Sequence, residues 1–286
     1  MTKLIAIDLD GTLLNEKNEI SENNKQALLD SQAEGIEVVI ATGRAHFDVQ
    51  TIFKNTGMKT WIIGANGATI HRPNGELFHH IPMKHEDALD SLKWLEHEEF
   101  YYEIFSKEAI LTPQNGRERL MIEMDRLLSA NPNISVEELN QAMAKQFSQT
   151  GFSYIGSPAE LNEMNIDIYN ILAFSFDDEK LNKGQVQFKD HKDLTVVSSA
   201  NHNFELEHKD ASKGNAMAIL AKKLGIHLAD TAAVGDSFND LSMLKTAGRS
   251  AAMGNAPDAI KEAAQSVTLS NHEDGVAHFI NSLRER

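Results

Sequence analysis

The chain has 286 residues, of which 41% are hydrophobic and 24% are charged, a balance that suits one large globular domain or two ordinary ones. Its formal net charge of −15 argues against nucleic acid or an anionic membrane as a partner, because both are recognised through basic surfaces. Cysteine is absent, which excludes disulfides, thiolate metal ligands and cysteine nucleophiles, so any metal ligand must be oxygen or histidine.

The first eighty residues alternate short apolar runs with helical patterns. We predict strands over Leu4–Leu9, Glu37–Ala41 and Trp61–Gly64, and helices near Ser21–Glu34 and Ala45–Asn55. Ser21 suits a helix N-cap, and Gly35 and Gly57 suit helix ends. Strands that alternate with helices in this way predict a parallel sheet.

The pattern changes in the middle of the chain, where longer helices are predicted near His85–Glu98, Gly116–Ala130 and Ser135–Gln149, with strands at Asn170–Phe176 and Leu194–Ser198. The alternating pattern then resumes. We predict strands at Phe204–Glu207, Thr231–Val234 and Ser250–Met253, and helices at Ser212–Leu224, Phe238–Thr246 and Glu273–Arg284. The expected fold is therefore α/β, with a first domain at 1–82 and 200–286 and an inserted second domain at 83–199.

No apolar run approaches the roughly 18 residues of a membrane span, and the apolar segment before Asp8 is too short for a signal peptide. We therefore expect a cytoplasmic protein with no membrane partner. The sequence carries no signal for an oligomeric state.

The segment Asp8-Leu9-Asp10-Gly11-Thr12-Leu13 places two carboxylates at the end of a strand that reads as buried. Unpaired buried charge is costly, so a cation is expected beside them, in the crevice where open α/β sheets bind ligands. A calcium loop of the EF-hand type does not fit, because Thr12 and Leu13 stand where a further ligand and a glycine are needed. An ordinary strand-end turn remains the alternative for this segment taken alone.

Three further segments carry residues suited to phosphate chemistry. Thr42-Gly43-Arg44 ends a strand with a hydroxyl and an accessible backbone N–H, and Lys213 follows the N-cap candidate Ser212 at a helix N-terminus, where anions are favoured. Gly235-Asp236-Ser237-Phe238-Asn239-Asp240 repeats the opening design of strand, glycine and acids. Singly, these segments also fit a common loop, an exposed lysine and a helix start. Together they predict a metal and phosphate site, whereas the histidines show no metal-ligand spacing.

These four segments, in this order, resemble the signature motifs of the haloacid dehalogenase-like phosphatase superfamily. Further segments and the insert resemble its Cof-type branch: Asn66-Gly67-Ala68, Met253-Gly254-Asn255-Ala256 and Asp274-Gly275-Val276-Ala277. The resemblance runs from Lys3 to about Ile280. It implies a Rossmann-like core with strand order 5-4-1-2-3 and an α/β cap that closes over the site and selects the substrate.

The resemblance also implies a role for each motif residue. Asp8 would be the nucleophile that forms an aspartyl-phosphate, and Asp10 the general acid and base. Mg²⁺ would be held by Asp8, the Asp10 carbonyl and Asp236, with Asp240 orienting the metal's waters. Phosphate oxygens would be bound by Leu9, Thr42, Gly43, Lys213 and Asn239. Arg44 would reach toward the leaving group or support its loop.

The function implied is a Mg²⁺-dependent phosphatase of a small phosphorylated metabolite. The overall residue pattern of the chain, including residues 112–117 and 201–209, is most similar to that of relatives that act on 5-amino-6-(5-phospho-D-ribitylamino)uracil. This compound is the first candidate substrate, beside a sugar phosphate. Two alternatives stay open: a phosphomutase, and a non-catalytic protein that binds a phosphometabolite on the same fold.

Overall fold

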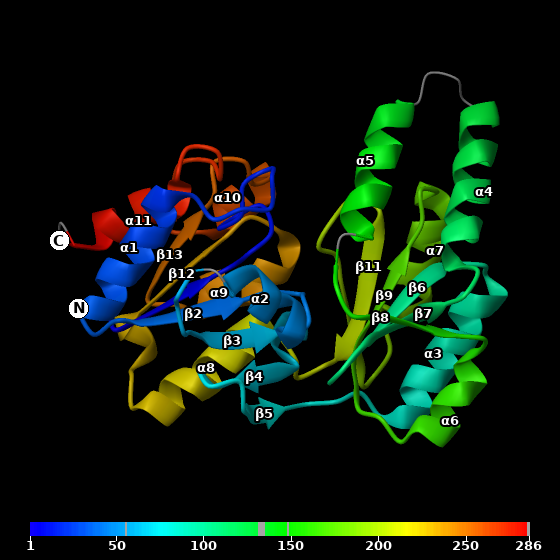
Figure 1. Ribbon diagram of the computed structural model, residues 1–286, viewed down its shortest axis with the longest axis horizontal. Helices are drawn as coiled ribbons and strands as arrows, with labels where there is room; N and C mark the ends of the chain where they lie inside the picture. Colours follow the sequence, from blue (N-terminus) through cyan, green and yellow to red (C-terminus); the bar gives the residue numbers. More distant parts are fainter. Residues whose placement is uncertain (55, 131–134, 148, 285–286) are drawn as a thin grey trace. The chain divides into compact units, whose positions relative to one another are not determined.

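The computed structural model describes residues 1–54, 56–130, 135–147 and 149–284, and the chain divides into two compact units (Figure 1). Unit 1 is made of Met1–Ile81 and Asp210–Arg286, and unit 2 of Pro82–Lys209. Unit 2 is thus a continuous segment inserted between the two segments of unit 1. No helix in the described ranges combines the length and the apolarity needed to cross a bilayer.

The described residues of unit 1 form a sheet with strand order β14-β13-β12-β1-β2-β3-β4-β5. Its strands are β1 (Leu4–Ile7), β2 (Glu37–Ala41), β3 (Trp61–Gly64), β4 (Thr69–His71), β5 (Leu77–His80), β12 (Thr231–Gly235), β13 (Arg249–Ala252) and β14 (Ser266–Val267). The strands from β14 to β3 run parallel, and β4 and β5 continue the sheet antiparallel. The expected order 5-4-1-2-3 is confirmed by β13-β12-β1-β2-β3.

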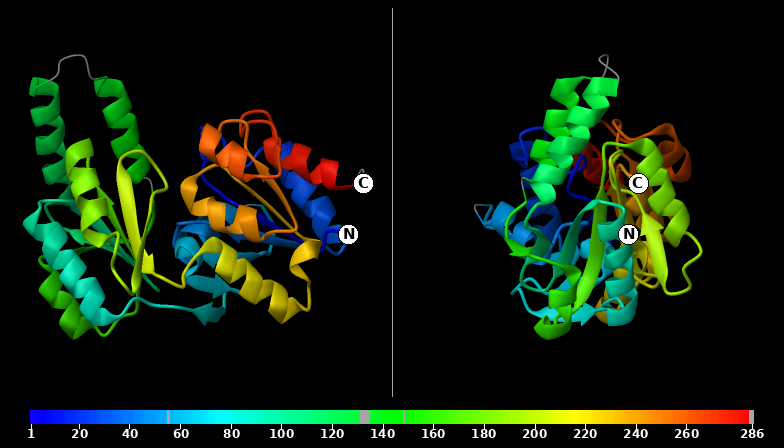
Figure 2. Two further views of the ribbon diagram at one scale, coloured as in Figure 1. Left: turned by 180° about the vertical axis from the view of Figure 1, so that it is seen from behind. Right: turned by 90° about the vertical axis from the view of Figure 1, so that its right-hand side faces the viewer.

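Helices cover both faces of this sheet. They are α1 (Glu22–Ala33), α2 (His46–Phe53), α8 (Lys213–Leu224), α9 (Leu241–Thr246), α10 (Asp258–Ala263) and α11 (Gly275–Arg284), with short 3₁₀ turns η1 (Ala65–Gly67), η3 (Leu228–Asp230) and η4 (Phe238–Asp240). Ile5 and Ile7 of β1 pack with α1, α2 and α11, whereas Leu4 and Ala6 pack with α8, α9 and α10. Helices α1 and α11 lie side by side (Figures 1 and 2). Burial on both faces explains why β1 is an unbroken apolar run.

Two of the predicted helix caps are present. The Ser21 hydroxyl accepts a hydrogen bond from the Asn24 N–H at the start of α1, and the Ser212 hydroxyl accepts one from the Asn215 N–H at the start of α8. Gly225 ends α8 in the left-handed conformation, with φ +71°. Helix α2 ends at Phe53, and its predicted end at residue 55 lies outside the described residues.

Unit 2 contains a second sheet, with strand order β10-β11-β9-β6-β7-β8 among its described residues. The strands are β6 (Tyr101–Ser106), β7 (Ile110–Pro113), β8 (Phe152–Ile155), β9 (Ile168–Phe174), β10 (Leu194–Val197) and β11 (Asn203–His208). The helices are α3 (His85–His97), α4 (Gly116–Ala130), α5 (Val136–Gln146), α6 (Leu161–Met164) and α7 (Asp178–Phe188), with the turn η2 (Pro158–Glu160). Tyr102, Ile171 and Phe204 point to one apolar face, which packs with α3 and α7.

The boundary between the units differs from the expected one at the return of the chain. Residues 200–209, which we expected in the first domain, belong to unit 2 because β11 pairs with β9 and β10 in the second sheet. A strand of alternating pattern is compatible with either sheet, so its sequence could not decide its partner. The predicted helix at Ser135–Gln149 is α5, which ends at Gln146; residue 148 lies outside the described residues.

Candidate active site

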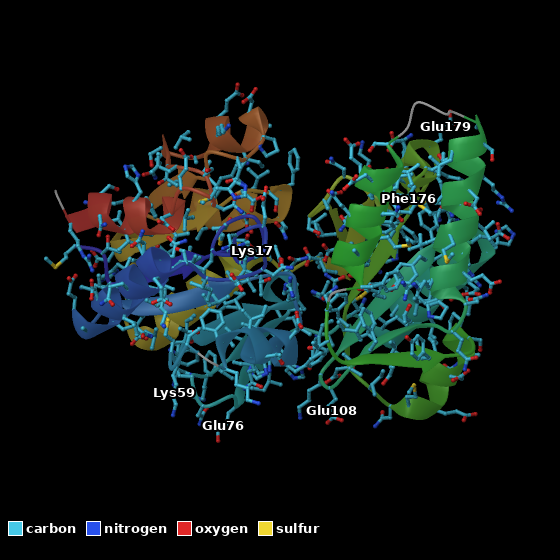
Figure 3. All side chains as sticks on the ribbon, turned by 45° about the horizontal axis from the view of Figure 1, so that its top comes forward. Lys17, Lys59, Glu76, Glu108, Phe176 and Glu179 are labelled. Carbon is cyan, nitrogen blue, oxygen red and sulfur yellow. The ribbon has the colours of Figure 1, made fainter. Side chains whose placement is uncertain are left out.

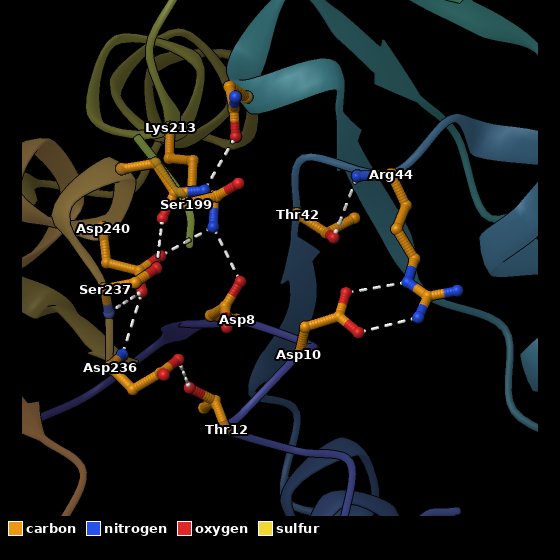
Figure 4. A network of polar contacts seen from close by, with 12 residues as sticks. Asp8, Asp10, Thr12, Thr42, Arg44, Ser199, Lys213, Asp236, Ser237 and Asp240 are labelled. Atoms are coloured by element: carbon orange, nitrogen blue, oxygen red, sulfur yellow. Dashed lines mark hydrogen bonds and ion pairs between the residues drawn. The ribbon is translucent and has the colours of Figure 1, made fainter. Parts of the chain in front are cut away.

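The predicted site residues of unit 1 converge at one edge of its sheet. Asp8 follows β1, Thr42 follows β2 and Asp236 follows β12. Because β1 pairs in parallel with both neighbours, Ile7 lies beside Ile40 and Val234, and the three chain ends emerge together. Figure 4 shows their side chains around a common centre. This is the edge at which open parallel sheets bind ligands.

Lys213 is the cation of this centre. It begins α8 and is completely buried, and its Nζ lies 2.7 Å from Asp8 Oδ1 and 2.6 Å from Asp240 Oδ1 (Figure 4). Burial alone would lower the pKa of Lys213, but the charges of Asp240 and Asp8 raise it above its ordinary value. Other charged side chains, such as Lys59 and Glu76, are exposed and point outward (Figure 3). The alternative of an exposed helix lysine is therefore wrong.

Asp8 is buried with one oxygen engaged and one open. Oδ1 accepts the hydrogen bond from Lys213, whereas no donor among the described residues reaches Oδ2. Burial, followed by the negative charge of Asp240, raises the pKa of Asp8 well above its ordinary value, although Lys213 opposes the rise. The site thus holds a carboxylate that lacks full compensation for its charge.

Asp236 faces Asp8 from the end of β12. Its Oδ1 accepts a 2.9 Å hydrogen bond from the Thr12 hydroxyl. Burial and the charge of Asp240 raise the pKa of Asp236 to about 6. Gly11, with φ +79°, passes so close that a Cβ there would lie 2.5 Å from Asp236 Oδ2, so the turn after Asp10 requires glycine.

Asp240 is held on both oxygens. Oδ1 accepts from Lys213, and Oδ2 accepts from the backbone N–H groups of Asp236 at 2.9 Å and Ser237 at 3.0 Å. A Cβ on Gly235 would lie 2.4 Å from Asp240 Cγ, so this glycine makes room for the carboxylate. These contacts fix the loop that carries Asp236.

Three carboxylates of the site fit a metal ion. One oxygen each of Asp8, Asp236 and Asp240 lies within 4.8 Å of the others, and Lys213 pairs with Asp8 and Asp240. A cation at this place would compensate the charge on the buried, open Asp8 Oδ2. It would also lower the raised pKa of Asp236. An all-oxygen donor set suits a hard divalent ion such as Mg²⁺.

Asp10 lies apart from this cluster, in an ion pair with Arg44. Arg44 Nε is 2.7 Å from Asp10 Oδ2, and Nη2 is 2.7 Å from Oδ1. Arg44 Nη1 also donates to Asp48 Oδ2 at 2.6 Å. Arg44 was expected to reach toward the leaving group or to support its own loop, and its contact with Asp10 was not predicted. Asp48 was missed in the sequence: it lies four residues after Arg44, but Arg44 precedes α2, so the pair is not one between two helix positions.

The remaining predicted phosphate ligands lie around the same edge. Thr42 is buried, and its hydroxyl accepts from the Arg44 N–H at 3.1 Å. Asn239 receives the Ser237 hydroxyl on Oδ1 at 2.6 Å and donates from Nδ2 to Asn66 Oδ1 at 3.0 Å. Leu9 lies in the chain between Asp8 and Asp10, and Gly43 follows Thr42. Asn66 belongs to a motif noticed in the sequence, but no role was predicted for it.

Comparisons with known proteins identify the family of the chain. The model of the haloacid dehalogenase-like hydrolases matches residues 5–280. Phosphatase YwpJ of Bacillus subtilis (strain 168) is 56% identical over 283 residues, which cover 98% of this chain and 99% of that protein. The 5-amino-6-(5-phospho-D-ribitylamino)uracil phosphatase YwtE of the same strain is 41% identical over 281 residues, or 98% of each chain.

A solved structure leads to the same assignment. A haloacid dehalogenase-like hydrolase from B. subtilis has 56% identity and a TM-score of 0.88, and the match covers 99% of this chain and 100% of that one. Family model, full-length relatives and fold all agree. The chain is therefore a phosphatase of the haloacid dehalogenase-like hydrolase family.

Proposed function

We propose that this protein is a Mg²⁺-dependent phosphatase that hydrolyses a small phosphorylated metabolite through an aspartyl-phosphate at Asp8. The observation that carries the proposal is the state of the Asp8 carboxylate. One of its oxygens is fixed by Lys213, and the other is buried with no donor in the described part of the chain. An oxygen in that state is suited to bind a cation or to attack phosphorus.

In the first step, an Asp8 oxygen attacks phosphorus and the ester bond to the leaving oxygen breaks, while Asp10 gives that oxygen a proton. In the second step, the Asp10 carboxylate takes a proton from water, the water oxygen attacks phosphorus, and the bond to Asp8 breaks. Inorganic phosphate and the free Asp8 carboxylate result. Asp10, two residues after the nucleophile, serves both steps.

The phosphoryl oxygens are bound by the Lys213 ammonium, the Thr42 hydroxyl, the Asn239 amide and the N–H groups of Leu9 and Gly43. Asp8, the Asp10 carbonyl and Asp236 would hold Mg²⁺. Asp240 fixes the loop of Asp236 through two backbone N–H groups and also binds Lys213. When bound, the metal neutralises charge on the phosphate so that an anionic nucleophile can approach it.

We assign the choice of substrate to unit 2, the cap, because the proposed catalytic groups all belong to unit 1. The first candidate is 5-amino-6-(5-phospho-D-ribitylamino)uracil, which the name of the 41% identical relative specifies as the substrate of that relative. Sugar phosphates are the second candidate class.

The test is phosphate release by the purified protein with Mg²⁺, from p-nitrophenyl phosphate and from a panel containing both candidate classes. Asp8→Asn is the matched inactive control, because an amide does not attack phosphorus as a carboxylate does. We expect turnover by the wild type alone. Equal release by Asp8→Asn would exclude Asp8 as nucleophile. Transfer of phosphate to a second alcohol would indicate a phosphomutase, and binding without turnover a phosphometabolite-binding protein.

A further inference from the structure

The turn at Ala65–Gly67 has an unusual backbone. Ala65, Asn66 and Gly67 have φ values of +46°, +52° and +104°. Residues other than glycine rarely have positive φ, and here three successive residues do. Such strain persists only where the surroundings enforce it, and it clusters at functional sites. The turn follows β3 and is buried throughout.

The surroundings of the turn are the loops that carry the proposed phosphate ligands. The Asn66 N–H donates to the Thr42 carbonyl at 3.0 Å, and the Ala65 N–H donates to the Arg44 carbonyl at 3.0 Å. Between these residues, a Cβ on Gly43 would lie 3.1 Å from Asn66 Oδ1. The turn is thus bonded directly to the loop after β2.

The same turn abuts the start of α8. A Cβ on Gly67 would lie 2.2 Å from the Ser212 carbonyl oxygen and 2.9 Å from the Lys213 nitrogen. Only glycine permits this approach. The backbone of Gly67 therefore packs against the N-cap that positions Lys213.

Asn66 reaches the third loop through its side chain. Its Oδ1 accepts a 3.0 Å hydrogen bond from Asn239 Nδ2, and both side chains are buried. An amide nitrogen carries two N–H groups. Since Asn66 binds one of them, and Ser237 binds the Asn239 carbonyl oxygen, the direction of the second N–H is fixed.

We propose that Asn66 is a positioning residue for phosphate: its side-chain oxygen aims the second N–H of Asn239 at a phosphoryl oxygen, while its turn sets the spacing of the Thr42 and Lys213 loops. This inference rests on the proposed function, in which Asn239 binds phosphate. It gives a role to a motif that the proposed mechanism leaves without one.

The test uses the full chain, the variant Asn66→Gly, and inorganic phosphate as the probe. Glycine keeps the left-handed backbone without strain and removes the side chain, and with it the amide. We expect phosphate affinity and kcat/KM to fall together by about 10- to 150-fold, the range of one lost hydrogen bond to a charged group. The control is Asn165→Gly, at an exposed left-handed residue of unit 2, which should change neither quantity.

A double-mutant cycle separates positioning from general support. If Asn66 acts through Asn239, then Asn239→Ala weakens phosphate binding in the wild type but by less than twofold in the Asn66→Gly background. Full additivity of the two losses would overturn the proposal, as would unchanged phosphate affinity in Asn66→Gly.

Asn66→Asp is the second variant, because aspartate also tolerates the left-handed region and keeps an acceptor oxygen for Asn239. In that background Asn239→Ala should again cause a loss of phosphate affinity, and no further loss would contradict the proposal. Phosphate binding is measured without turnover. A wild type that binds phosphate with this dependence on Asn66 but hydrolyses no ester would therefore overturn the proposed function and not the role of Asn66.

Discussion

Arg44 grips Asp10 through a two-pronged ion pair, with both contacts at 2.7 Å, and is itself anchored by Asp48. A guanidinium fork of this kind stabilises the ionised carboxylate and fixes its orientation. The proposed acid must carry a proton to protonate a leaving group. In the proposed mechanism Asp10 therefore loses part of its contact with Arg44 while it carries a proton in the first step. The ion pair can form again when Asp10 is ionised.

Arg44→Lys should lower kcat/KM by roughly tenfold or more, because lysine offers a point charge in place of the fork. The loss should be larger for an alkyl phosphate than for p-nitrophenyl phosphate, whose leaving group needs little protonation. Arg72→Lys is the control, since Arg72 lies over the rings of Phe78 and Trp61 and does not contact Asp10. Equal losses in the two variants would remove the special role of Arg44.

Asp10→Asn should reduce turnover by about 10²- to 10⁴-fold, the usual share of general acid–base catalysis. An amide cannot deliver the proton, so poor leaving groups should suffer most. The measurement is kcat for a series of phosphate esters of graded leaving-group pKa. A constant loss across the series would argue against Asp10 as the acid.

Asp236→Ala should raise the Mg²⁺ concentration required for half-maximal activity, because it removes a charged ligand from the cluster. Chelator should abolish wild-type activity, and added Mg²⁺ should restore it. The control is Asp258→Ala, which removes an exposed acid in the first turn of α10. Full wild-type activity in excess chelator would refute the metal requirement.

Lys213→Met should weaken all phosphate esters by a similar factor, because Lys213 reads only the phosphoryl group that they share. Substitutions in unit 2 should instead change the ranking of substrates and spare p-nitrophenyl phosphate. One substrate panel run on both kinds of variant measures the difference. A re-ranked panel in Lys213→Met would contradict this division of roles.

Glu103→Gln tests a buried acid of unit 2. Burial raises the pKa of Glu103 from 4.5 to about 7, against the hydrogen bonds that its carboxylate accepts from Tyr101 and Gln149, which lower it. The folded state thus binds the proton more tightly than the unfolded chain does. Its contribution to stability is complete below about pH 4.5 and is lost as the pH rises through 7, by ~3 kcal/mol at most.

The measurement is urea unfolding of unit 2 between pH 4.5 and 8, in a Trp61→Phe background, so that the fluorescence comes from Trp94. Glu103→Gln should flatten the decline in stability with pH, because glutamine does not titrate. Glu118→Gln, at an exposed position of α4, should leave the decline unchanged. A decline of equal slope in both variants would show that Glu103 is not its source.

The sequence predicted those parts of the fold that local patterns determine. Unbroken apolar runs marked β1, β2, β3 and β12, and serine caps marked α1 and α8. The antiparallel extension β4–β5 was missed because its residues, such as His71 and His79, lack an apolar alternation. The strand at β11 was found but placed in the wrong sheet, because its partners β9 and β10 are set by tertiary packing.

The candidate site likewise contains residues that local patterns predict and contacts that they do not predict. Asp8, Lys213, Asp236 and Asp240 were predicted from strand and helix ends, and the structure brings them within hydrogen-bonding or ligand distance of one another. The contacts between Asn66 and Asn239, 173 residues apart, and between Arg44 and Asp10 depend on how loops meet. No local pattern encodes such meetings.

The pairing of β1 with β12 has a consequence for folding during translation. Leu4 pairs with Thr231, so the strand that leads to Asp8 gains one of its two neighbours only after about four-fifths of the chain has been synthesised. Unit 2 is continuous and is complete at residue 209. We therefore expect the inserted unit to fold first during translation, while β1 lacks its β12 neighbour until the last quarter of the chain is made.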